Sequence, residues 1–259
     1  MDGAKVYRDY SNGESSNYLI RAMCLAVCKS RQALPFLRLT GDGPLLKPLE
    51  FGAKLLKGLD AAIKADLEVD RVVKVQILAL LHLHNDGLGG VDRSSNYLSQ
   101  AITEAWAMSL HWNFPGNPDQ RRCDMLWWSL RNFDRLNKPI MGAAPFMIDD
   151  ADIGIERIAI EAGDYRSEVM GVSLLLGDLM KSATKLYRAT CRATEDDCDD
   201  FPSLATLTFG TGFDKFHKAH KRTVWRSPAT SFGALCGVNV YNNDLSSIGK
   251  RTTRAVGRV

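Results

Sequence analysis

Cysteine thiols are the side chains of this chain best suited to hold a metal ion, and their spacing argues against a metal site. No two cysteines stand in the C-x2-C arrangement that zinc sites usually use. Cys24 and Cys28 lie one helical turn apart, and we interpret them as small apolar residues. We therefore expect no metal or other cofactor in this chain. The six cysteines are spread over its whole length, at Cys24, Cys28, Cys123, Cys191, Cys198 and Cys236.

Histidine offers a second set of possible metal ligands in His82, His84 and His111, with Asp86 close by in sequence. A His-x-His pair near the end of a helix points its two rings in different directions, and no cysteine pair completes a site. These histidines are therefore interpreted as structural.

Two loops resemble ligand-binding loops only superficially. The glycine-rich run 86–90 follows a predicted helix instead of a strand and has no Gly-Lys-Ser/Thr, so a nucleotide site is not predicted. The acidic run Asp149-Asp150-Ala151-Asp152 lacks the glycine and the distal glutamate of an EF-hand. We predict that arginines, not calcium, neutralise these aspartates.

The charge balance gives no sign of a nucleic-acid surface or of a membrane span. Lys and Arg total 33 against 30 for Asp and Glu, and a net charge of +3 is too small to mark a dedicated DNA-binding face. Basic stretches at 217–226 and 250–258 are interpreted as scattered surface charge. No apolar run approaches the roughly 18 residues of a membrane span, and the first residues do not form a signal peptide. We expect an intracellular protein that does not enter the membrane.

Apolar residues recur at helical spacing through most of the chain, and no segment shows the alternation of a strand. This pattern predicts an all-α fold with an irregular multi-helix arrangement. We divide the chain into a polar N-terminal segment (1–16), a helical domain (17–220) and a tail of uncertain order (221–259). Helices are predicted at about 17–31, 48–67, 69–83, 94–111, 119–138, 166–193 and 204–221.

Three pieces of sequence follow one another in an order that is similar to the middle homology region of fungal zinc-cluster transcription factors. The first is a buried helix with Gln76-Ile77-Leu78-Ala79-Leu80-Leu81, followed by the glycine loop and by Ser109-Leu110-His111. The second and third contain paired arginines, paired tryptophans, Asp-Arg, a Gly-to-Pro turn and the acidic run. Their residues are Arg121, Arg122, Trp127, Trp128, Asp134, Arg135, Gly142, Pro145, Asp149, Asp150 and Asp152.

The chain departs from the family pattern at three points. Ser109 stands where the family usually has glycine, Ala143-Ala144 replaces the arginine of Gly-Arg-Pro, and the proline that commonly follows the acidic segment is missing. The resemblance covers about residues 15–193.

The resemblance implies a nuclear regulator of RNA polymerase II transcription that is not an enzyme. DNA and zinc would be bound by a separate cluster domain, and this region would control activity, with a homodimer, the transcription machinery or a small-molecule effector as further partners. Two alternatives stay open: an all-α binding protein or enzyme with a pocket between helices, and a truncated, non-functional regulator.

The residues that carry the resemblance are predicted to be structural. Adjacent on a helix, Trp127 and Trp128 point roughly 100 degrees apart, so one can enter the core while the other fixes a neighbouring helix. We expect Asp134 to pair with Arg131 or Lys138. Arg122 or Arg135 is expected to reach the acidic run.

Overall fold

The computed structural model describes residues 3–87, 89–136 and 146–187, and every regular element in these ranges is helical. The predicted all-α class is therefore confirmed. The helices are α1 (Gly3–Ser11), α2 (Asn17–Val27), α3 (Pro48–Lys64), α4 (Arg71–His82), α5 (Gly90–Ala107), α6 (Gln120–Leu136) and α7 (Tyr165–Tyr187), with two short 3-10 turns, η1 (Leu34–Phe36) and η2 (Asp150–Asp152).

Helix α1 was not predicted, because the first 16 residues contain few apolar residues and no clear period. It nevertheless forms, and Val6 on it packs against the main core. Several other helices are shorter than predicted, as for α2, which ends at Val27 instead of continuing to Arg31. The predicted helix at 204–221, the tail at 221–259 and both basic stretches lie outside the described residues.

Local sequence explains where the helices begin. Pro48 occupies the first turn of α3, as predicted, because its missing N–H has no role there. The side chain of Asp70 accepts hydrogen bonds from the backbone N–H groups of Val72 and Val73, at 2.8 and 3.1 Å, and so caps α4.

The turn between α4 and α5 corrects one prediction. We expected Asp92, Ser94 or Ser95 to cap α5, but the helix begins earlier, at Gly90, after Gly89 in a left-handed conformation with φ of 65°. Ser94 is instead buried inside α5, where its hydroxyl donates a hydrogen bond to the carbonyl of His82.

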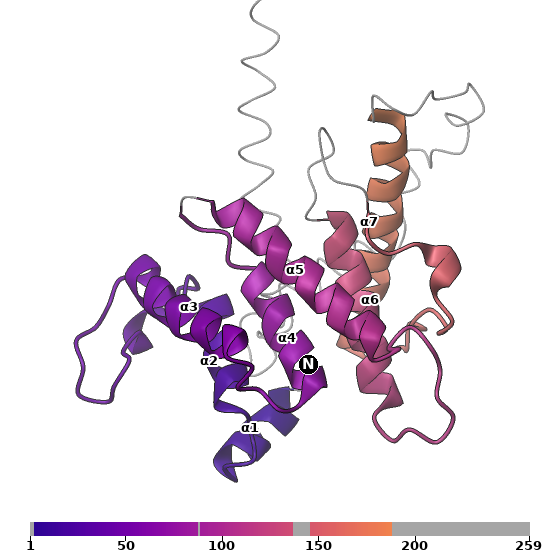
Figure 1. Cartoon of the computed structure of the whole chain (residues 1–259). Helices are drawn as coiled ribbons and strands as arrows, with labels where there is room; N and C mark the ends of the chain where they lie inside the picture. Colours follow the sequence, from indigo (N-terminus) through magenta and orange to yellow (C-terminus); the bar gives the residue numbers. More distant parts are fainter. Residues whose placement is uncertain (1–2, 88, 137–145, 188–259) are drawn as a thin grey trace, which may run out of the picture.

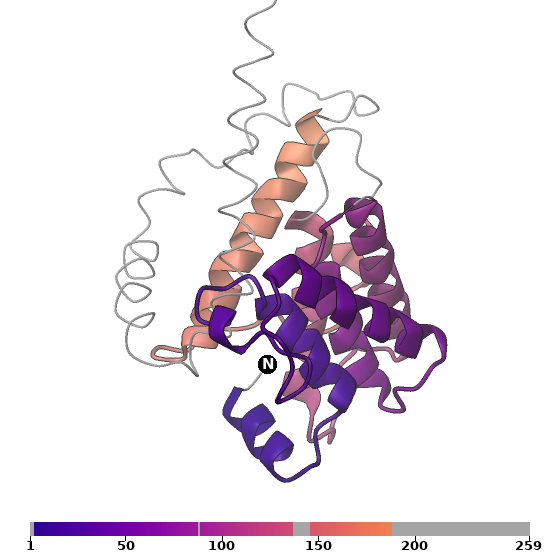
Figure 2. The same ribbon diagram turned by 90° about the vertical axis from the view of Figure 1, so that its left-hand side faces the viewer.

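Helix α4 is the centre of the fold, and every residue from Val75 to His82 is buried. It packs between α2 and α5, with α3 on the outer side of α2. Helix α6 packs on α5 and α4, and α7 packs on α6. Figure 1 shows this row of helices, with α2 and α3 on one side of α4 and with α6 and α7 on the other. In the view of Figure 2, α7 stands along the outer edge of the molecule.

Residues 146–164 join α6 to α7, and we call them the strap. The strap runs back along α6: its start contacts Asp134 near the end of that helix, and its end contacts Arg121 near the beginning. Helix α7 then runs in the same direction as α6. Gly177 permits their close approach, since a methyl group there would lie 2.5 Å from Oδ1 of Asn132. Two motif residues, Gly142 and Pro145, precede the strap and lie outside the described residues.

None of the described helices is long and apolar enough to cross a membrane.

Candidate functional site

The paired tryptophans of α6 are both buried, as predicted. Trp127 is 0% exposed, and its ring meets that of Trp106 on α5 edge to face, with centroids 4.9 Å apart. Trp128 points toward the strap, where its indole N–H donates a 2.9 Å hydrogen bond to the carbonyl of Glu156. One tryptophan therefore fixes α6 to α5, and the other fixes it to the strap instead of to the neighbouring helix that was predicted.

The Asp-Arg pair of α6 holds the start of the strap. The carboxylate of Asp134 accepts hydrogen bonds from the backbone N–H groups of Met147 and Ile148, at 2.8 and 3.1 Å. Arg135 reaches Asp150 with a 2.8 Å ion pair, and its guanidinium lies over the ring of Phe146, 5.8 Å from the centroid. Of the two predicted partners of Asp134, Lys138 lies outside the described residues.

Arg131, Arg135, Asp150 and Asp178 form a cluster that connects three elements, and we call it the arginine cluster. Arg131 on α6 donates two hydrogen bonds to Asp150 of η2, at 3.0 and 3.2 Å, and one to Asp178 of α7. The side chains of Arg131 and Arg135 are only 2% and 0% exposed. Lys181 and Arg157 approach the same aspartates from the solvent side.

Electrostatics favours the charged form of this cluster. Burial alone raises the pKa of Asp150, but the hydrogen bond and charge of Arg131, together with the charge of Arg135, hold that pKa well below its usual range. The two buried guanidinium groups would be costly without the aspartates, because a buried charge needs a partner. Asp150 and Asp178 are therefore the counter-ions of the cluster, with Asp150 the nearer one to Arg135.

Of the two arginines predicted as possible partners of the acidic run, Arg122 at the start of α6 does not reach it. Arg122 donates a 3.1 Å hydrogen bond to Oε1 of Gln76 on α4, not to the acidic run. Arg121 pairs with Glu161 and Asp164 at the end of the strap, at 2.8 and 3.3 Å. The acidic run is reached by Arg135, as predicted, and also by Arg131, which we had not assigned to it.

The three aspartates of the acidic run have three separate roles. Asp149 caps η2, with its side chain accepting a hydrogen bond from the N–H of Ala151. Asp150 enters the arginine cluster, whereas Asp152 lines a pocket formed by the strap and α5. One turn of 3-10 helix thus connects the arginine cluster to the pocket.

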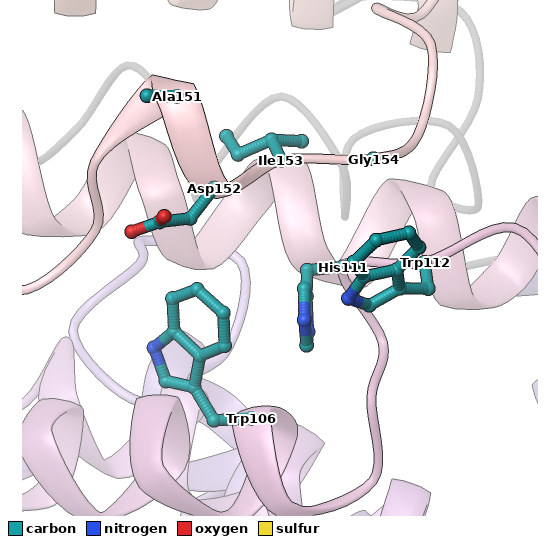
Figure 3. A pocket seen from close by; sticks show the side chains of 7 residues that line it. All are labelled: Trp106, His111, Trp112, Ala151, Asp152, Ile153 and Gly154. Carbon is teal, nitrogen blue, oxygen red and sulfur yellow. The ribbon is translucent and has the colours of Figure 1, made fainter.

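This pocket has a volume of about 330 Å³ and is partly open to solvent. Its walls come from the last turns of α5, the turn after it, and the strap. Figure 3 shows His111 between the indole of Trp106 on one side and that of Trp112 on the other, with the Asp152 carboxylate on the Trp106 side. The seven lining residues are Trp106, His111, Trp112, Ala151, Asp152, Ile153 and Gly154.

Ring contacts make one wall of the pocket rigid. The imidazole of His111 lies 4.3 Å from the ring of Trp106 and 5.7 Å from the ring of Trp112, centroid to centroid. Gly154 donates a 2.8 Å backbone hydrogen bond to the carbonyl of His111, which joins the strap to this wall. A methyl group at Gly154 would lie 3.2 Å from the Trp112 ring, so the small residue lets the indole cover the strap.

The pocket holds one formal negative charge. Burial lowers the pKa of His111, and the nearby Asp152 opposes that shift only in part, so the imidazole is neutral near neutral pH. In the described part of the chain, no hydrogen bond or ion pair involves the Asp152 carboxylate. Aromatic faces and one unpaired carboxylate are therefore its main chemical features.

Within the described residues, His82, His84 and Cys28 fill structural positions. Nδ1 of His82 lies 2.9 Å from the carbonyl oxygen of Ser94, and His84 packs over Gly52. Cys28 is buried beside Leu37 and Phe51, as expected of a small apolar residue, whereas Cys24 is exposed. Over residues 3–87, 89–136 and 146–187, no group of three His, Cys, Asp or Glu residues is placed to hold a metal ion.

Several residues of this site were not found by sequence reasoning. Asp178 is an acidic residue within the largely apolar middle of α7, and Arg131, which was considered only as a partner of Asp134, is a charged residue on the apolar face of α6. A charge at a core position is itself a signal for a buried ion pair. For Trp106 and Trp112 the sequence offers no such signal, because the pocket joins segments about 40 residues apart.

Comparisons with models of known protein families, with curated proteins and with solved structures find no match to this chain.

Proposed function

We propose that this chain is the regulatory region of a nuclear transcription factor that controls genes read by RNA polymerase II. The proposal rests on the similarity of its motif residues to the middle homology region of fungal zinc-cluster factors. In this proposal, DNA and zinc are bound by a separate cluster domain, and the helical body sets the activity of the whole factor.

The observation that supports the proposal most directly is the contact between two motif pieces that are distant in sequence. Asp134 and Arg135 of α6 bind the strap at Ile148 and Asp150. Two of the residues that carry the resemblance on α6 thus hold the start of the strap. A chance similarity gives no reason for these residues to meet.

The same contacts suggest how the region would respond to a ligand. Asp150 and Asp152 lie two residues apart on η2, one in the arginine cluster and the other in the pocket. A ligand that shifts Asp152 therefore acts on the element that pairs with Arg131 and Arg135. The strap is the proposed link between an effector and the position of α7.

A reporter assay tests this proposal. The whole chain is fused to a heterologous DNA-binding domain, and transcription from the matching promoter is compared with that of the DNA-binding domain alone. We expect the fusion to change reporter output severalfold, and we expect Asp150→Ala to alter that change, because it leaves two buried guanidinium groups with Asp178 as their remaining buried counter-ion.

Glu156→Ala is the matched control, since this exposed strap residue uses only its backbone carbonyl in a contact with Trp128. Equal protein levels are verified by immunoblot. Reporter output identical to that of the DNA-binding domain alone would contradict the proposed function.

A second candidate function, a carrier or receptor for a small molecule with no role in transcription, is favoured by the pocket itself. Its volume of about 330 Å³ lies at the small end of the range for ligand sites. We propose binding at this pocket because its described lining is mainly aromatic and apolar, with one imidazole and one carboxylate as its polar groups. Ligand binding combined with an inactive reporter would support this second function.

A further inference from the structure

The pocket between α5 and the strap has a chemistry that selects one class of ligand. Trp106, His111 and Trp112 offer aromatic rings, whose faces carry partial negative charge, and Asp152 adds a full negative charge beside them. This combination attracts a cation whose surface is apolar, because such a cation loses little hydration when it contacts aromatic rings.

No cationic side chain of the described residues neutralises the Asp152 carboxylate in this pocket. In the described part of the chain no Lys or Arg pairs with Asp152, although Arg131, Arg135 and Lys181 all pair with Asp150, two residues away. The imidazole of His111 carries no charge of its own near neutral pH, so it does not repel a cation. Asp152 is exposed to solvent, and its carboxylate has neither the arginine partners of Asp150 nor the capping role of Asp149.

A second, smaller pocket differs from the aromatic pocket, because its charged residues pair with each other. It has a volume of about 280 Å³, and its charged lining residues Lys74 and Glu104 pair with each other at 3.4 Å. Lys74 also pairs with Asp66, so the charges there are already satisfied. Of the two pockets, the aromatic pocket is therefore the one that contains an unpaired charge.

We infer that the pocket of Trp106, His111, Trp112 and Asp152 binds a small organic cation with a methylated ammonium head. The head group lies against the aromatic rings that line the pocket, and Asp152 neutralises its charge. This inference names the class of effector that the pocket binds. It rests on the proposed function only for the effect of binding on transcription, and the binding itself does not depend on that function.

The test uses the purified full chain and choline, with 3,3-dimethylbutan-1-ol as the neutral probe of nearly the same shape. Indole N–H signals in a nitrogen-15 correlation spectrum are followed during titration at constant ionic strength. We expect saturable shifts for Trp106 and Trp112, a dissociation constant of roughly millimolar order, and binding of the neutral probe at least about fivefold weaker. Trp128 is the internal control, because its N–H is bonded to Glu156 outside the pocket.

Two variants assign the binding to the proposed residues. Asp152→Asn is expected to weaken choline binding by roughly fivefold or more while leaving the neutral probe unchanged. Trp112→Leu removes one aromatic face at a side chain that is 56% exposed, and we expect it to weaken choline more than the neutral probe. Glu156→Gln, a carboxylate change on the same strap outside the pocket, is the control and should bind like the wild type.

The inference is overturned if choline produces no saturable shift, if the neutral probe binds as tightly as choline, or if Asp152→Asn binds choline like the wild type. A trimethyllysine peptide separates two sources of the same head group: tighter binding of the peptide supports a protein side chain, and tighter binding of choline supports a free metabolite. Because these measurements need no transcription, their failure is distinct from failure of the reporter assay.

Discussion

Arg131 of α6 and Asp178 of α7 stand 47 residues apart in sequence and form a direct hydrogen bond in the arginine cluster. The guanidinium of Arg131 also lies over the ring of Trp128, 5.7 Å from its centroid, and binds Asp150 through two of its nitrogens. One buried side chain therefore joins α6 to both the strap and α7. The stability of this half of the molecule depends on charges as well as on apolar packing.

Asp150→Ala should destabilise the protein by about 3 kcal/mol. The change removes the nearer ion-pair partner of Arg135, which then keeps only Asp178 at 3.9 Å, and it leaves Arg131 with Asp178 alone, so buried positive charge is poorly compensated. We place the value at the lower end of the usual range because Asp150 is itself half-buried. Denaturant unfolding measures it. Glu156→Ala on the same strap should change stability by less than about 0.5 kcal/mol, and an equal loss in both variants would contradict this role for Asp150.

The contribution of Asp150 should disappear in acid. Its pKa in the folded protein lies below the value of about 4 that an aspartate has in an unfolded chain. Its contribution is thus present above about pH 4 and is lost as the pH falls through the lowered folded value. The difference in unfolding free energy between the wild type and Asp150→Asn should shrink below about pH 4. A difference that is constant from about pH 7 to pH 3 would be inconsistent with this assignment.

Trp127→Ala should cost about 3 to 5 kcal/mol, because the side chain is fully buried against Trp106 and His111. Trp112→Ala is the matched control, since more than half of that side chain is exposed, and we expect a loss of about 1 kcal/mol or less. Thermal unfolding monitored by circular dichroism measures both. Similar melting temperatures for the two variants would mean that Trp127 is not a core residue.

Two glycines should respond to alanine in opposite directions. A methyl group at Gly90 would lie 2.0 Å from the carbonyl oxygen of Asn85, so Gly90→Ala must displace the turn between α4 and α5 and lower the melting temperature. At Gly58, inside α3, nothing lies within 4 Å, and alanine is the better helix former by roughly 0.5 to 1 kcal/mol. Gly58→Ala should therefore raise the melting temperature, and a decrease at both positions would contradict the packing described for them.

The isolated chain should bind DNA weakly and without sequence preference, because a net charge of +3 supplies little phosphate attraction. A mobility-shift assay with unrelated duplexes tests this, and any complex should dissociate as salt is raised. A salt-resistant complex with one sequence would show that the chain contains its own specific DNA-binding surface. It would also remove the need for a separate cluster domain in the proposed function.

Sequence reasoning predicted the elements whose signals are local. The apolar run that forms α4, the two tryptophans of α6 and the pairing of Arg135 with the acidic run all follow from residue type and spacing. Helix α1 was not predicted because it has little apolar surface. The cap of α5 was predicted at the wrong residue, because Gly89 provides it through its backbone conformation and not through a side chain. The hydrogen bond from Arg131 to Asp178 and the aromatic pocket depend on how the strap folds back, which no local pattern specifies.

The 47-residue separation of Arg131 and Asp178 also has a consequence for the order of events on the ribosome. At about 5 to 20 residues per second, α6 is made several seconds before its partner on α7. During that interval the face of α6 that will be buried carries Arg131 and Arg135 among its apolar residues. Before Asp178 is made, Arg131 and Arg135 have only Asp150 as a partner in the cluster, and positive charge on this face opposes premature association of nascent chains, as gatekeeper residues do beside hydrophobic segments. The same arginines would thus first oppose association of the nascent chain and afterwards join α6 to the strap and α7 in the folded protein.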